Sequence, residues 1–317
     1  MRIRQGRLWL GLVIGAVFLY LTFRDAEFAK IGALLRYALI PPLLGSLCLR
    51  LASHWMRALR WRSILAPLGP MSRARAFGIF SVGEIYNALL PARAGDLYRI
   101  LLASKEQFVG MAAAGASVFL EKLLDLGVVL IFLISTSAVL TSPDVIDLPL
   151  HSLVLGFVTL SLLLILFLNN GPLLRTYLPL GQMAARFRDG LLVLRHPGHT
   201  LGILGASLFL WVLSGLAVYL VLVALHLPLP WYAGFFVIGV SALGSFIPSA
   251  PGALGTMEFL VVISLYALGV DRNAALAGAL LARALQVGNL LLAGIVSAFY
   301  RDGNPWLVPT DADRSEA

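Results

Sequence analysis

Long apolar segments recur along the whole 317-residue chain, and they constrain its fold more than any other feature. A helix needs roughly 20 apolar residues to cross about 30 Å of hydrocarbon. Candidate spans lie at residues 8–23, 38–59, 109–140, 148–168, 200–226 and 273–300. Charged residues make up only 13% of the chain, whereas soluble domains have roughly 25%. We therefore predict an all-α polytopic membrane protein, a single membrane domain over residues 1–317 that ends in a polar cytoplasmic tail at 301–317.

Two further apolar stretches are interrupted by helix-breaking residues. Residues 76–102 contain Pro91 and Gly95, and residues 231–268 contain two prolines and several glycines. Proline inside a helix removes a hydrogen bond, and in lipid such a break survives only where protein or a water-filled cavity satisfies the freed backbone. We predict a re-entrant helical hairpin at each stretch, beside about six spanning helices. The second stretch is also long enough for two full spans, which would give eight membrane helices.

The basic residues predict the orientation of the chain. They concentrate in the N-terminal segment, in the link after residue 59, in residues 175–195 and in the tail, so the positive-inside rule predicts cytoplasmic N- and C-termini. With this orientation, residues 1–140 and 148–300 have the same order of spans and hairpins in opposite directions. This pattern is an inverted-topology repeat, as in many secondary transporters.

Charged residues near the middle of two spans are candidates for function, because a charge at the bilayer centre costs roughly 2.5–3.5 kcal/mol. Glu121 and Asp125 share one helix face, and Arg283 and Gln286 share a face of the last span. We expect the Glu121 and Asp125 face to meet Arg283 across the interface of the halves. The contact is either a structural ion pair that fixes helix packing, or a functional one that acts as a gate or binds a lipid headgroup. Arg50, deep in the second span, is a weaker cavity candidate.

The two breaks carry the remaining candidates. The first break combines Pro91 with five polar side chains, namely Glu84, Asn87, Arg93, Asp96 and Arg99. An arginine fork suits phosphate, although Arg93 and Arg99 are also explained as ordinary basic residues on the cytoplasmic side. The second break has candidates at Pro248, Gly252, Gly255 and Glu258. A helix that begins near Thr256 would place Glu258 in its first turn, where capping alone or an anion site accounts for it.

Several function classes lack their usual signals. The sequence has no H-E-x-x-H, G-x-S-x-G or P-loop motif, so we expect a transporter-like protein rather than an enzyme. Its one cysteine, Cys48, lies in an apolar segment and excludes a disulfide framework. We expect no cofactor, no metal and no nucleic-acid partner.

Three motifs in order resemble the flippase-like family related to the lysylphosphatidylglycerol synthetase transmembrane region. They are Asn87-x3-Pro91-x3-Gly95-Asp96-x2-Arg99, Glu121-Lys-Leu-Leu-Asp125 and Pro248-Ser-Ala-Pro-Gly-x2-Gly255-x2-Glu258. The family has Glu at the position of Asp96, Arg at Lys122 and a second Gly at Ala253. Its bifunctional members join this region to a soluble aminoacyl-transferase domain, which this sequence lacks. The resemblance therefore implies lipid translocation or its assistance rather than synthesis.

From residues and resemblance together we expect a lipid translocase of the bacterial inner membrane. Its substrate would be a phospholipid, an aminoacyl-lipid or a polyprenyl-phosphate-linked lipid, with the headgroup passing between the two hairpins. The alternatives are a non-catalytic membrane subunit or enzyme of envelope lipid or glycolipid biosynthesis, and a scaffold. Expected partners are an anionic or phosphate-linked membrane lipid, with a second copy of the chain or an envelope-biosynthesis enzyme as further candidates.

Overall fold

Helices are the only regular elements in the part of the chain that the computed structural model describes, which is residues 2–106, 110–140, 157, 187, 190–195, 197–244 and 249–299. The α-helices are α1 (Arg2–Phe23), α2 (Phe28–Arg36), α3 (Ile40–Leu65), α4 (Arg73–Leu89), α5 (Ala94–Glu106), α6 (Met111–Leu140), α10 (Pro197–Ala224), α11 (Ala233–Leu243), α12 (Thr256–Ala267) and α13 (Arg272–Phe299). Short 3-10 turns lie at η1 (Pro91–Arg93), η2 (Leu192–Arg195) and η4 (Pro251–Ala253). The expected span 148–168, apart from residue 157, and the tail 301–317 lie outside the described residues.

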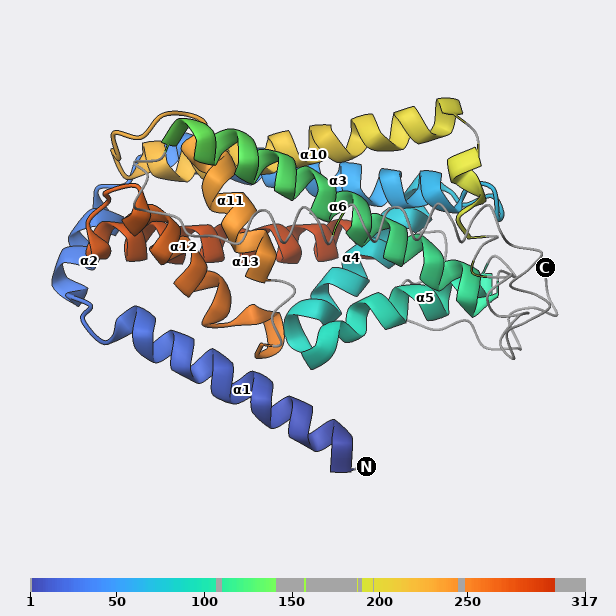
Figure 1. Cartoon of the computed structure of the whole chain (residues 1–317), viewed down its shortest axis with the longest axis horizontal. Coiled ribbons are helices and arrows are strands. Elements are labelled where there is room, and N and C mark those ends of the chain that lie inside the picture. Colours follow the sequence, from blue (N-terminus) through green and yellow to red (C-terminus); the bar gives the residue numbers. More distant parts are fainter. Residues whose placement is uncertain are drawn as a thin grey trace.

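Four long helices, α3, α6, α10 and α13, run roughly along the long axis of the molecule (Figure 1). Helices α10 and α13 are long and apolar enough to cross a membrane, and α2 with α3 passes the same test as one span bent by 87°. Helix α3 packs along α10. Two serines of α3 hold this contact, because Ser46 donates to the carbonyl of Ala217 at 2.7 Å and Ser53 donates to that of Leu210 at 3.0 Å.

Both interrupted stretches fold as helical hairpins. Helices α4 and α5 form one, and α11 and α12 form the other. They open toward opposite ends of the long helices and bring their tips together, with η1 beside η4 (Figure 1). A Cβ on Gly252 would lie 2.9 Å from the carbonyl oxygen of Ala88, so the tips touch backbone to backbone. Helices α11 and α12 have 11 and 12 residues, or about 16–18 Å. Each is too short for a full span, which favours the re-entrant alternative over eight spans.

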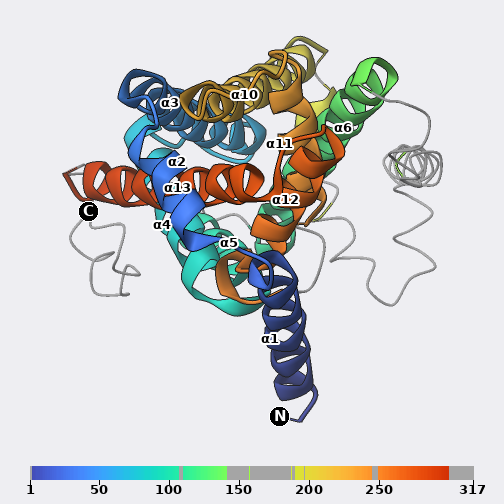
Figure 2. The same ribbon diagram turned by 90° about the vertical axis from the view of Figure 1, so that its left-hand side faces the viewer.

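Helix α1 projects from the bundle and docks on the tip of the second hairpin (Figure 2). The contact depends on glycine. A Cβ on Gly11 would lie 2.8 Å from the oxygen of Ser249, and one on Gly15 would lie 2.9 Å from the Cβ of Ala250. Gly11 and Gly15 have the small-x3-small spacing that lets membrane helices approach closely. The second break is therefore covered by α1 on one side and by the first hairpin on another.

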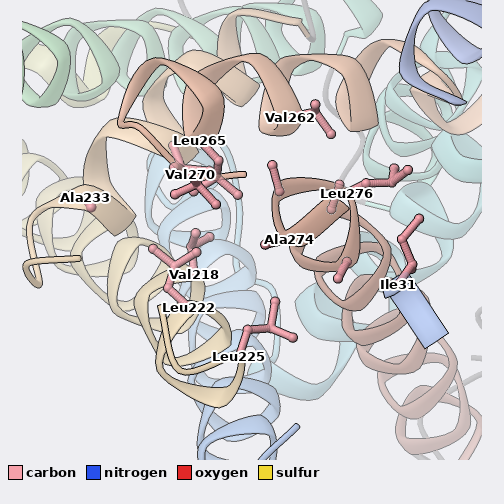
Figure 3. Close-up of a cluster of buried hydrophobic side chains, with 14 residues drawn as sticks. Ile31, Val218, Leu222, Leu225, Ala233, Val262, Leu265, Val270, Ala274 and Leu276 are labelled. Atoms are coloured by element: carbon pink, nitrogen blue, oxygen red, sulfur yellow. The ribbon is translucent and has the colours of Figure 1, made fainter. Parts of the chain in front are cut away.

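One apolar cluster joins α2 to α10, α11, α12 and α13 (Figure 3). Leu265 and Ala275 are fully buried there, with Leu222 and Leu276 each about 1% exposed. Burial of a leucine side chain stabilises a protein by roughly 1.5–3 kcal/mol when the side chain would otherwise contact water. The gain is smaller where it would otherwise contact lipid, because lipid tails are as apolar as leucine. The cluster fixes α12 beside α13, and this placement determines which charged residues meet.

Candidate functional site

The break of the first hairpin is closed by a side-chain bridge between Asn87 and Asp96. The amide of Asn87 donates to the Asp96 carboxylate at 3.1 Å, and its oxygen accepts the backbone N–H of Asp96 at 3.1 Å. Gly95 makes the approach possible, because a Cβ there would clash with the backbone of α4. Arg93 has a left-handed backbone with φ 54° and also donates to Asp96 at 3.1 Å. Asp96 therefore organises the tip, whereas Arg93 lies at its partly exposed mouth.

A fully buried ion pair joins this hairpin to α6. The Nη2 of Arg99 donates to the Oε2 of Glu121 at 2.7 Å, and both side chains are nearly inaccessible to solvent. The guanidinium also lies over the rings of Trp61 and Phe80, at 4.5 and 4.4 Å from their centroids. Arg99 is therefore enclosed by one carboxylate and two aromatic rings, although its Nε is buried without a hydrogen-bond partner. The prediction that Glu121 meets Arg283 is wrong, because α5 lies beside α6 and supplies the nearer arginine.

Asp125, the second acid of that face, also pairs with a residue other than Arg283. The Nη1 of Arg60 on α3 donates to it at 2.7 Å, and the indole N–H of Trp211 on α10 donates at 2.9 Å. Arg60 donates to Ser207 as well, at 2.9 Å. Sequence reasoning missed Arg60 because this arginine was counted among the basic residues of a cytoplasmic link. Two acids one turn apart in a span require buried cations, and this requirement is the signal that would have found it.

The second break is held by Arg283. Its Nε donates to the Oε1 of Glu258 at 2.5 Å, and its terminal nitrogens donate to the carbonyls of Gly252 at 3.0 Å and Ala253 at 3.4 Å. All three acceptors belong to the hairpin, so one guanidinium ties the break to α13. The other carboxylate oxygen of Glu258 accepts the backbone N–H of Gly255 at 2.8 Å. Thr256 begins α12, and Glu258 caps its N-terminus, which is one of the two roles that the sequence left open.

Backbone strain is concentrated at this same break. Gly252, Ala253 and Gly255 all have positive φ, at 64°, 54° and 83°. Glycine adopts these angles freely, whereas an alanine there is strained by roughly 1–2 kcal/mol. Such strain persists only where the surroundings hold it, and here the Arg283 contacts to Gly252 and Ala253 do so. Pro248, the remaining candidate of this loop, lies outside the described residues.

A cavity of about 50 Å³ lies against the Arg283 and Glu258 pair. Helices α3, α10, α11, α12 and α13 line it, mostly with apolar residues. Its polar lining consists of Arg50, Ser241, Glu258, Arg283 and Gln286. The structure thus brings Gln286 and Glu258 together with Arg283. It keeps this group apart from the Arg99 and Glu121 pair, so the candidates form two charged clusters, one for each hairpin.

The chain matches the model of the lysylphosphatidylglycerol synthase transmembrane region over residues 8–294. It belongs to this family. The family is a flippase-like membrane region, and the resemblance to this family is confirmed. A UPF0104 membrane protein of Methanocaldococcus jannaschii is similar, with 29% identity over 226 residues that cover 69% of this chain and 94% of that protein. Membership supports a multi-pass membrane protein.

The motifs of this synthase-region family map onto the two charged clusters. The first two motifs meet in the Arg99 and Glu121 pair, and Lys122 reaches Asp96 at 3.7 Å. The third motif supplies Glu258 and the strained loop that Arg283 binds. The departures at Asp96, Lys122 and Ala253 therefore all lie at contacts that hold a hairpin in place.

Proposed function

We propose that this protein translocates an amphiphilic lipid that carries a phosphate between the two leaflets of a bacterial inner membrane. The headgroup passes between the two hairpin tips, while the acyl or prenyl chains remain in the bilayer. The observation that carries this proposal is the meeting of η1 and η4, two broken-helix tips that come from opposite ends of the long helices (Figure 1). Broken helices that meet at mid-membrane are where secondary transporters bind substrate.

The packing of the helices supports an inverted repeat within residues 1–140 and 148–300. Helix α4 packs on α13 and α11 packs on α6, so the first helix of each hairpin contacts the long helix of the other half. Asp96 and Glu258 are each the third residue of the helix that follows a break. Two halves that exchange such contacts can rock against each other around a central path, which is the motion that alternating access requires.

The clusters have different roles in this proposal. Arg99 is 0% exposed and bound to Glu121, so it holds the first hairpin rigidly instead of binding a headgroup. Arg283 is 18% exposed and borders the cavity, so its contacts with Glu258 and the loop carbonyls form a latch that opens as the headgroup passes. Movement is passive or coupled to an ion, because the sequence has no P-loop for a nucleotide.

Dithionite bleaching of fluorescent lipids in proteoliposomes tests this function. For the natural protein we expect bleaching of more than about half of the label, because lipids from the inner leaflet reach the outside. Arg283→Ala should return bleaching to the level of empty vesicles, whereas the matched control Arg36→Ala should not change it, because Arg36 is exposed on α2. Bleaching equal to that of empty vesicles, with both phospholipid and prenyl-phosphate probes, would contradict translocation and favour a non-catalytic subunit or enzyme of envelope lipid biosynthesis.

A further inference from the structure

Arg50 differs from the other arginines inside the bundle because it has no counterion among the described residues. Arg60, Arg99 and Arg283 each donate to a carboxylate at 2.7 Å or less. Arg50 has neither an ion pair nor a hydrogen bond within the described ranges, and its Nε is buried without a partner. A charged donor removed from water without a partner is costly, and the protein retains it facing a cavity.

The position of Arg50 follows from the contact between α3 and α10. It lies one turn after Ser46 and one turn before Ser53, and both serines donate to carbonyls of α10. Residues at this spacing share a helix face, so Arg50 is held on the side of α3 that faces the bundle. From there it lines the cavity together with Arg283. Three apolar side chains of the buried cluster in Figure 3, Val218, Leu222 and Leu265, also line this cavity.

The other polar groups of the cavity are already occupied. Ser241 donates to the carbonyl of Val237 at 2.7 Å, and the Glu258 carboxylate accepts from Arg283 and from Gly255. Arg283 donates to three acceptors of the hairpin. Within the described residues, Arg50 and the Gln286 amide are therefore the cavity donors that have no acceptor. The side chains that line the cavity carry a net positive charge, since one carboxylate faces two arginines.

We propose that Arg50, assisted by the Gln286 amide, binds the phosphate of the translocated lipid. This inference rests on the proposed function and assigns the headgroup subsite within it. A guanidinium supplies paired donors that match phosphate oxygens, and the amide adds one more donor. A cavity of about 50 Å³ has room for the equivalent of a few waters, so it accepts a phosphate-sized group and excludes a sugar unless the latch opens. Arg50 binds the anion, and the latch that Arg283 forms with Glu258 and the loop carbonyls lies beside it.

Binding of short-chain phosphatidylglycerol to the purified full chain in detergent, measured by microscale thermophoresis, tests the subsite. Arg50→Gln should weaken binding at least about tenfold, a loss of about 1.4 kcal/mol. Arg50→Lys should restore part of the affinity because it keeps the charge. The matched control Arg36→Gln, which removes an exposed charge, should leave it unchanged. Gln286→Leu should weaken binding about threefold, which tests the same cavity if Arg50→Gln does not fold.

Three results would overturn the assignment. Equal affinities of the natural protein, folded Arg50→Gln and Gln286→Leu would exclude the cavity as the phosphate subsite. Affinity for a short-chain diacylglycerol equal to that for phosphatidylglycerol would exclude phosphate recognition. Binding of inorganic phosphate as tight as that of the lipid, and equally dependent on Arg50, would identify free phosphate instead of a lipid as the ligand. The subsite and the proposed function are tested separately. If lipid binding depends on Arg50 but dithionite does not reach the inner-leaflet lipid, the subsite is supported and translocation is contradicted.

Discussion

Individual arginines in this protein are distinguished by what they bind. Arg99 binds Glu121 and is sealed between two aromatic rings, Arg283 binds a hairpin break, and Arg50 faces a cavity. The buried pairs fix helix positions, since an ion pair removed from water is tolerated only when its geometry is satisfied. An arginine without a counterion is instead available to a ligand.

The Arg99 and Glu121 pair gives a prediction about stability. Glu121→Gln should lower the free energy of unfolding by about 3 kcal/mol, because it removes the carboxylate that Arg99 binds most closely and leaves Asp96, at 3.7 Å, as its acidic partner. The double variant Glu121→Leu with Arg99→Met should recover most of that loss, because Arg60 keeps Asp125 and Lys122 keeps Asp96. Titration with sodium dodecyl sulfate measures both free energies. A double variant as unstable as the single one would show that the pair does more than neutralise charge.

At the scale of helices, the sequence predicted the positions of the breaks well and the partners of the charges poorly. Proline fixes its own φ and restricts the residue before it, so the end of α4 just before Pro91 follows from local chemistry. The start of α12 at Thr256 follows from Gly255, whose positive φ glycine adopts freely. The partner of Glu121 depends on which helix lies beside α6. Periodicity shows that Glu121 and Asp125 share a face, but tertiary packing decides that the preceding helix α5 and the earlier helix α3 lie against that face.

Ala253 gives a prediction about the second hairpin. Ala253→Gly should raise the free energy of unfolding by about 0.5–1 kcal/mol, because it removes the cost of a left-handed backbone at an alanine. The matched control Ala284→Gly, at an exposed position of α13, should lower it by about 0.5–1 kcal/mol. The same detergent titration measures both changes in the free energy of unfolding. A destabilised Ala253→Gly protein would mean that the loop does not hold the positive φ seen here.

At the scale of the molecule, two hairpins meet tip to tip within a frame of long helices. The order of apolar and broken segments was sufficient to predict both hairpins. It did not predict that α1 would dock on the second tip, because close contact through Gly11 and Gly15 leaves no trace in hydropathy. The first and third motifs lie at the two tips, the second motif on α6 binds the first hairpin, and the proposed path lies between the tips.

Linking the tips chemically tests that path most directly. In a Cys48→Ala background, Ala88→Cys and Ala253→Cys place thiols on the two sides of the contact, since Gly252 packs against the backbone of Ala88. Treatment with a short bis-maleimide should abolish bleaching of inner-leaflet lipid in proteoliposomes, whereas treatment with N-ethylmaleimide should leave it intact. Full translocation by the cross-linked protein would contradict passage of the headgroup between the hairpins.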